Sequence, residues 1–510
     1  MRLRRVVLFV AIVGAATWTI PSQGQQAIPV PEGPRTAPYT SDRPIAIVGG
    51  LLIDATGAPA RHDMTVVTSG DRIVDIGPME QVKVPSGAHV IDASGMTIMP
   101  GLMDSNMHIV LNPMYATPDV GLPYEEFKTR WEGNWARMER EAFTYLMQGI
   151  TGFRQTPGPA SLELALKKRI DAGEVPGPRI HLGGALWMSE VHFQQHLKRY
   201  EQTDPKAIDF IRHRFEYNVI RDLKNLDPNG WGVEGPDFNY WKIYLWDDPY
   251  DGKNDFTDEE LRFIIDRGHK LGKKIDIHVG GSGIPGLRRG LQFDVDTLEH
   301  PFERDVIVDW DIIQGYVKKD VIIDSLLQVK LAASERAADP HRFSETPYIM
   351  SMDPSEYRLL MRYRDKMVWN QRNPDRRGFG VYPADAGQTG RTYVEQMQII
   401  ATAKENMRRF IKAGAKFAMG TDTGAMMGFR QENPHAREMM HMVEMGMTPM
   451  QAIESATRIN AEVLGMQKEL GTIEKGKLAD LIVVAGNPLL NMESAMKRVY
   501  VVVKGGVRYK

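Results

Sequence analysis

Three side chains that could bind a metal ion stand at the ends of short apolar segments in this chain. His278 ends KIDIH, His300 follows TLE, and Asp422 lies within GTDTG. Neutral imidazoles and carboxylates are good Zn²⁺ ligands, and a site with an open coordination position can hold water and lower its pKa toward about 7. The residues therefore favour metal-assisted hydrolysis, in which Asp422 is the candidate catalytic group that accepts a proton from water and returns it to a leaving amine.

Strand and helix patterns alternate through the middle of the chain. Short apolar segments such as GITGFRQ, PRIHLGG, YWKIYLW and AKFAMGTDTG are separated by stretches with helical periodicity. This alternation predicts parallel strands joined by crossover helices, as in an α/β (β/α)8 TIM-like barrel, whose active site forms at the C-terminal ends of the strands. Lys242, His278, His300 and Asp422 all fall at such ends.

Both ends of the sequence are rich in β-branched residues and turn residues. Residues 43–99 and 467–510 contain runs such as IAIVGGLLIDATG and VYVVVKGGVRY, which are typical of strands joined by tight turns. We expect the two ends to combine into one small β-sandwich beside a barrel formed by residues 100–466. The segment at about 303–391 is rich in proline, glycine and charge. It is interpreted as an insertion, either a lid over the barrel mouth or a surface subdomain without a catalytic part.

The segment MPGLMDSNMHIV, residues 99–110, nearly matches the PGxxDxHxH signature of the amidohydrolase superfamily. The chain resembles the imidazolonepropionase and prolidase-like branch over about residues 45–510, most specifically in the segment that ends GTIEKGKLADLIVVAGNPL. The resemblance implies one or two zinc ions, held by an HxH pair, a lysine carboxylated by carbon dioxide, two histidines and an aspartate. By position these are Asn106 and His108, Lys242, His278, His300 and Asp422.

Asn106 departs from the family pattern, because it replaces the first histidine of the HxH pair. An amide oxygen is a weaker zinc ligand than imidazole. Three outcomes stay open: two metal ions with a weakened first site, one ion held mainly by Lys242, His278 and His300, or no metal. An unmodified Lys242 would repel a cation, whereas carboxylation would make it an anionic bridge with two oxygens.

The leading hypothesis for function is hydrolysis of an amide, peptide-like or cyclic amide bond by metal-activated water. One alternative is a single-metal deacetylase, decarboxylase or isomerase on the same scaffold. Another is a non-catalytic protein that binds small molecules and has a decayed metal site. Asp422 favours catalysis, because a binding protein has no need of an aspartate at this strand end.

Other residues near predicted strand ends could contact a substrate. His192 and His196 lie four apart, so on a helix they would share a face and could reach a metal or substrate, or they could form a solvated polar face. Trp187 and Trp246 could line a pocket for an apolar group or pack in the barrel wall. Asp104 is interpreted as a buried carboxylate that orients the metal ligands.

Composition and the N-terminus bear on partners and location. A net charge of -2, without a basic run interleaved with aromatic residues, argues against nucleic acid. Residues 1–24 combine early arginines with a short apolar run, which predicts an export signal, and residues 25–42 form a proline-rich lead-in. With no cysteine in the chain, a periplasmic or secreted protein without a stable membrane anchor is expected. A small-molecule substrate is expected, while the export route and a homo-oligomer stay open.

Overall fold

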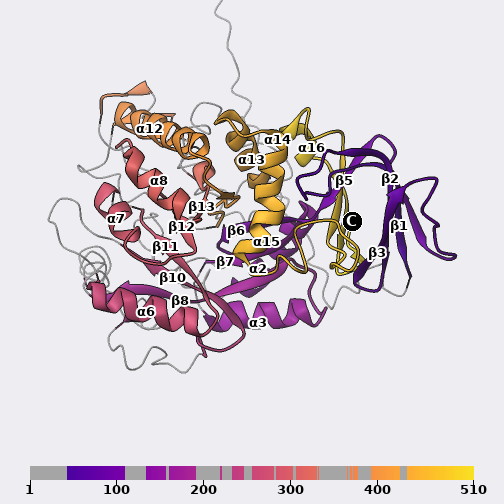
Figure 1. Cartoon of the computed structure of the whole chain (residues 1–510), viewed down its shortest axis with the longest axis horizontal. Helices are drawn as coiled ribbons and strands as arrows, with labels where there is room; N and C mark the ends of the chain where they lie inside the picture. Colours follow the sequence, from indigo (N-terminus) through magenta and orange to yellow (C-terminus); the bar gives the residue numbers. More distant parts are fainter. Residues whose placement is uncertain are drawn as a thin grey trace, which may run out of the picture.

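The structure is a computed structural model that describes two connected regions, a barrel and a sheet formed by the termini (Figure 1). The described residues are 43–109, 134–156, 160–190, 194, 219–220, 232–245, 256–280, 283–302, 306–329, 331, 365, 368–369, 372–376, 392–424 and 433–510. The predicted export signal and lead-in lie outside them, as do His192, His196, Trp246 and the side chain of Trp187.

Eight parallel strands form the barrel, which confirms the predicted fold class. In their order around the sheet they are β6 (Leu102–Met107), β7 (Ile150–Gln155), β8 (Arg179–Ser189), β10 (Phe238–Tyr244), β11 (Lys274–His278), β12 (Thr297–Glu299), β13 (Ile322–Asp324) and β14 (Phe417–Ala418). A short strand, β9 (Val219–Ile220), pairs beside β8. The first and last strands meet where Met107 bridges Thr423 and where the amide of Ser105 donates to the carbonyl of Met419 at 3.0 Å.

Helices cover the outside of these strands (Figure 1). They include α2 (Asn134–Met147), α3 (Ala160–Asp171), α6 (Asp258–Lys270), α7 (Gly283–Gly290), α8 (Trp310–Lys318), α12 (Tyr393–Lys412), α13 (Pro434–Glu444), α14 (Pro449–Glu454) and α15 (Asn460–Val463), with a π-helical turn at Ser455–Ile459. Helix α6 illustrates the local rules: Thr257 and Glu260 form a capping box at its start, and Leu261, Ile264 and Ile265 form its buried face.

The first part of the segment at 303–391, which the sequence analysis interpreted as an insertion, is not an insertion. Within 303–391, helix α8 and strand β13 belong to the barrel itself. The strand has only three residues and all are buried. A run this short carries no clear periodicity, so the sequence pattern did not separate it from the polar segment that follows.

The two termini share one mixed sheet of eight strands, seen on the right of Figure 1. Its members are β1 (Ile45–Leu52), β2 (Arg61–Ser69), β3 (Arg72–Pro78), β4 (His89–Asp92), β5 (Met96–Pro100), β15 (Leu481–Ala485), β16 (Val499–Lys504) and β17 (Val507–Arg508), with α16 (Met492–Met496) between β15 and β16. Antiparallel pairing of β5 with β15 joins the N-terminal and C-terminal parts.

Polar contacts connect this sheet to the barrel. Arg179, at the start of β8, donates to both carboxylate oxygens of Asp480 at 3.1 and 3.0 Å. The buried ammonium of Lys504 donates to the carbonyl of Gly177 at 2.6 Å. Among the described residues, no helix is both long and apolar enough to cross a membrane.

Candidate active site and metal-binding residues

Closure of the barrel brings together two of the predicted residues that lie more than three hundred positions apart in the sequence. The amide of His108 donates to the carbonyl of Thr423 at 2.9 Å, and the amide of Asp422 donates to the carbonyl of Asn106 at 2.8 Å. These backbone bonds place Nε2 of His108 at 3.0 Å from one carboxylate oxygen of Asp422. The other oxygen of Asp422 lies 3.6 Å from Nε2 of His300, so the carboxylate lies between two imidazoles.

Gly424 allows this close approach. Its φ of +89° favours glycine, and an added Cβ would overlap the carbonyl oxygen of His108. The last glycine of GTDTG therefore has a structural role in placing His108 against the segment that carries Asp422.

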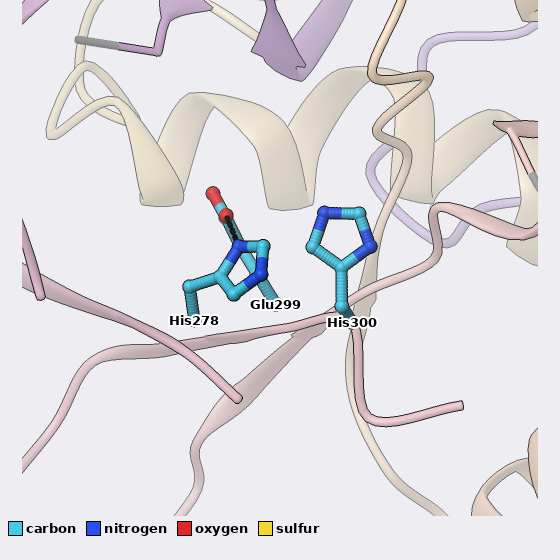
Figure 2. Close-up of side chains that lie close together, drawn as sticks. All are labelled: His278, Glu299 and His300. Carbon is cyan, nitrogen blue, oxygen red and sulfur yellow. Dashed lines mark ion pairs between the residues drawn. The ribbon is translucent and has the colours of Figure 1, made fainter. Parts of the chain in front are cut away.

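His278, Glu299 and His300 form a second cluster, on the neighbouring strand ends of β11 and β12. One ligand atom from each of the three side chains lies within 4.8 Å of the others, and all three are buried. Figure 2 shows the side chains extending into a common space, with His278 directed toward Glu299. Nδ1 of His278 is 3.6 Å from a Glu299 oxygen, and the two imidazole centroids are 4.5 Å apart. Two imidazoles and a carboxylate are a donor set that suits zinc and related divalent ions.

Sequence reasoning missed Glu299. Successive residues of a strand point to opposite faces, so a strand ending in TLEH would direct Glu299 and His300 apart. His300 instead adopts a left-handed backbone conformation, with φ +54°. This turn follows the last strand residue and lets two consecutive side chains reach the same cluster. A signal was present in the sequence, because a carboxylate next to a candidate ligand in an apolar strand needs a partner when buried.

The partner of Glu299 is Lys242, at the end of β10. Nζ of Lys242 forms an ion pair with Oε2 of Glu299, the same oxygen that lies near His278, and both side chains are buried. The structure thus places the predicted metal-bridging lysine beside the His278 and His300 pair. Its carboxylation stays a prediction.

Arg154, on β7, supplies a further cation below this cluster. Its guanidinium lies 3.0 Å from Glu299, 3.1 Å from Asp324 and 3.3 Å from Asp276, with its side chain almost wholly buried. Burial raises the pKa of Asp276 and of Asp324 well above the usual range, because the charged forms lose hydration. Burial also opposes ionisation of Glu299, but Lys242, Asp276 and Arg154 outweigh it and lower the pKa of Glu299. Glu299 is therefore the carboxylate of this group that stays most readily ionised.

Asn106 is fully buried at the end of β6. Its amide oxygen accepts a hydrogen bond from the hydroxyl of Thr156, while its amide nitrogen has no hydrogen-bond partner among the described residues. In this arrangement the oxygen, the atom that would bind a metal, already has a donor. Asp104 holds the backbone nearby: one of its oxygens accepts from the amides of Asn106 and Thr421, at 2.9 and 3.1 Å.

The other histidines and tryptophans near the strand ends divide into two groups. His192, His196 and Trp246 lie outside the described residues, as does the side chain of Trp187, so their predicted contacts with substrate stay predictions. Trp241, beside Lys242, is buried and donates to the carbonyl of Val233 at 3.2 Å, which makes it part of the barrel wall.

The chain belongs to the amidohydrolase family. The sequence profile of that family matches residues 251–508, which is just over half of the chain. The matched region includes His278, Glu299, His300 and Asp422, and the protein is accordingly an enzyme of a class that acts on carbon–nitrogen bonds.

Individual proteins are similar at low identity over most of the chain. An imidazolonepropionase from Flavobacterium johnsoniae is 23% identical over 443 residues, covering 83% of this chain and 86% of the relative. A Xaa-Pro dipeptidase structure with bound methionine has a TM-score of 0.66 at 22% identity, over 92% of this chain and 100% of the other. A molinate hydrolase structure gives the same score and identity, over 92% and 95%. At this identity the two structures support the fold alone.

Proposed function

We propose that this protein hydrolyses an amide, peptide-like or cyclic amide bond in a small molecule, using a metal ion and Asp422. Family membership supports amide hydrolysis, and the names of similar proteins, an imidazolonepropionase and a Xaa-Pro dipeptidase, agree with that class of bond. The observation that carries the proposal is the position of Asp422, between His108 and His300 and next to the His278, Glu299 and His300 cluster.

The donor atoms fit one divalent ion better than two. His278 and His300 supply imidazoles, and the anionic oxygen comes from Glu299 or from carboxylated Lys242. A second ion would have Asn106 in place of an imidazole, and the amide oxygen of Asn106 is a weaker ligand that already accepts a hydrogen bond from Thr156. We therefore favour a single strong site, with zinc as the first candidate, and with His108 and Asp422 contributing at most a weaker one.

Carboxylation of Lys242 and metal binding should depend on each other. The ammonium form pairs with Glu299, whereas a carboxylated Lys242 would place two anions side by side in a buried site. Arg154 offsets part of the charge of Glu299, and a bound metal cation would offset the added anion. We infer that Lys242 is carboxylated when the metal binds and keeps its ammonium form otherwise.

The residues divide the work of hydrolysis as follows. A divalent ion in the site would polarise the scissile carbonyl and lower the pKa of water. Asp422 accepts a proton from the attacking water and returns it to the leaving nitrogen, since its two oxygens lie at the centre of the site. His108 and His300 keep that carboxylate in place through its two oxygens. A protein that only binds a small molecule would not need a carboxylate held between two imidazoles.

The test is to measure metal content and hydrolysis in wild-type protein, Asp422→Asn and His278→Ala. Substrates would be a panel of dipeptides and N-acyl amino acids. Asp422→Asn should keep the fold and at least one metal ion but lose kcat by several orders of magnitude, because an amide cannot accept the proton. His278→Ala should lose the metal. Reconstitution of metal-free wild type with zinc should be stronger with bicarbonate than without it.

Two results would contradict the proposal. Turnover near the wild-type level in Asp422→Asn would mean that another group accepts the proton. Wild-type protein without metal, and activity insensitive to chelators, would mean that hydrolysis does not use this site in the way described. Zinc binding independent of bicarbonate would instead assign the anionic ligand to Glu299 alone.

A further inference from the structure

Tyr244 is an aromatic residue beside the histidine cluster, and the proposed mechanism does not use it. It is the last residue of β10, it is buried, and its partner in the parallel pairing of β10 with β11 is His278. Alternate residues of a strand share a face, so Tyr244 lies on the same face of β10 as Lys242. That face is turned toward the cluster, because Nζ of Lys242 contacts Glu299.

The rings of Tyr244 and His278 are stacked. Their centroids are 4.2 Å apart and their planes differ by 19°, so the face of the phenol ring lies against the face of the imidazole. On the side of β12, the centroid of the His300 imidazole lies 4.5 Å from that of His278, with the planes tilted by 52°. His278 is therefore in ring contact with residues from both neighbouring strand ends.

A contact on the ring face suits an imidazole that binds a metal ion. The two nitrogens donate or accept at the edge of the ring, so a ring stacked on the face competes with neither of them. The torsion that rotates a histidine ring about its Cβ–Cγ bond has broad minima, and an adjacent aromatic ring restricts this rotation. A hydrogen bond at the second nitrogen usually orients a metal-bound histidine, and the stack on Tyr244 adds a restraint on the ring plane.

Binding of a divalent ion would strengthen the stack. The ion withdraws electron density from the imidazole, and the electron-rich face of a phenol ring attracts a group that carries positive charge. Water screens this attraction little, since Tyr244 and His278 are each only 7% exposed. The stack therefore adds to metal affinity the difference between its strength with the ion and its strength without it.

We propose that Tyr244 is a positioning residue for the metal site, whose ring fixes the orientation of the His278 imidazole and stabilises its metal-bound form. The proposal rests on the single strong metal site proposed above, and it adds a residue that acts through one of the ligands. The phenol hydroxyl has no part in it, so the ring of phenylalanine should replace that of tyrosine.

The first experiment measures the zinc dissociation constant of metal-free wild type, Tyr244→Leu and Tyr244→Phe, by competition with a chromophoric chelator in one bicarbonate buffer. Tyr244→Leu removes the ring but keeps an apolar side chain. Its Kd should rise roughly tenfold, which corresponds to about 1.4 kcal/mol and lies within the range measured for aromatic pairs. Tyr244→Phe keeps the ring, so its Kd should stay within about twofold of wild type. A Kd of Tyr244→Leu equal to that of wild type, or of Tyr244→Phe as weak as that of Tyr244→Leu, would overturn the proposal.

Tyr316→Leu is the matched control. Tyr316 is also buried, but it lies on α8 outside the barrel strands, where its hydroxyl donates to the carbonyl of Leu287 at 2.8 Å. The same substitution there should lower the free energy of unfolding and leave the zinc dissociation constant unchanged. If Tyr316→Leu weakened zinc binding as much as Tyr244→Leu, the cause would be a general loosening of the protein, and the assignment of Tyr244 would be wrong.

A measurement on the metal-free protein separates this proposal from the proposed function. The probe is the ¹H signal of the Cε1–H group of His278, observed in protein with ¹³C-labelled histidine and assigned by its absence in His278→Gln. The ring current of a stacked aromatic ring shifts this signal upfield, so wild type and Tyr244→Phe should show the shift and Tyr244→Leu should lose it. This pattern in a protein that binds no zinc would refute the metal site, and with it the contribution to affinity, while keeping Tyr244 as the residue that orients His278. The same signal position in all three proteins would refute the orienting role.

Discussion

Replacing Arg154 with methionine tests whether one buried cation stabilises the base of the site. The guanidinium contacts carboxylates of Asp276, Glu299 and Asp324 at 3.0 to 3.3 Å, and it is as buried as they are. Removing one partner of a buried ion pair costs about 3–5 kcal/mol, because the remaining charge stays desolvated.

For Arg154→Met we expect a loss of stability at the lower end of that range. Burial raises the pKa of Asp276 and of Asp324, so these carboxyl groups can take up protons once Arg154 is gone. We therefore expect Arg154→Met to lower the free energy of unfolding by about 3 kcal/mol. In a chain of this size the midpoint of thermal unfolding should fall by about 3 °C, at roughly 1 °C per kcal/mol.

The assay is thermal and urea unfolding of wild type, Arg154→Met and Arg267→Met. Arg267 is the matched control: it pairs with Glu234 at 2.9 Å, but its side chain is 38% exposed. An exposed pair of this kind contributes about 0–1 kcal/mol, so Arg267→Met should unfold almost as wild type does. A loss in Arg154→Met no larger than in Arg267→Met would refute the reasoning and imply that the three carboxyl groups are neutral in the folded protein.

Two further substitutions test how the structure positions and stabilises these parts. Gly424→Ala should reduce kcat/KM at least tenfold, because its Cβ would displace His108. Gly173→Ala is the control and should leave activity unchanged, since Gly173 also has a positive φ but no atom lies within 4 Å of an added Cβ. Equal activity of the two variants would show that His108 tolerates displacement. Burial lowers the pKa of Lys504 to about 8 from 10.5. The unfolded chain therefore binds more protons between these values, and the free energy of unfolding should rise with pH across that window by up to about 3 kcal/mol, a contribution that is absent below pH 8. Lys504→Met should lack this contribution in urea unfolding at pH 7.5 and 10.5, and an equal rise in both proteins would exclude Lys504 as its source.

Local patterns in the sequence were enough to predict the barrel and the position of most candidate ligands. Alternating strand and helix signals imply parallel strands, and parallel strands align their C-terminal ends. His278, His300 and Lys242 follow from that rule, and the structure places them together around Glu299. The β-rich termini were likewise predicted to join, and β5 pairs with β15.

Strand register and closure of the barrel determine the side-chain contacts that could not be predicted from the sequence. The left-handed turn at His300 brings its side chain to the same cluster as Glu299, and the 3.0 Å contact between His108 and Asp422 exists only because the first and last strands meet. No local periodicity encodes such pairs, since they depend on backbone bonds between segments more than three hundred residues apart. Thr156 is a similar case: it follows β7, and its hydroxyl donates a hydrogen bond to the amide oxygen of Asn106 on β6. The sequence by itself determined which side chains stand at the strand ends, and the tertiary structure decided which of their atoms remain available for chemistry.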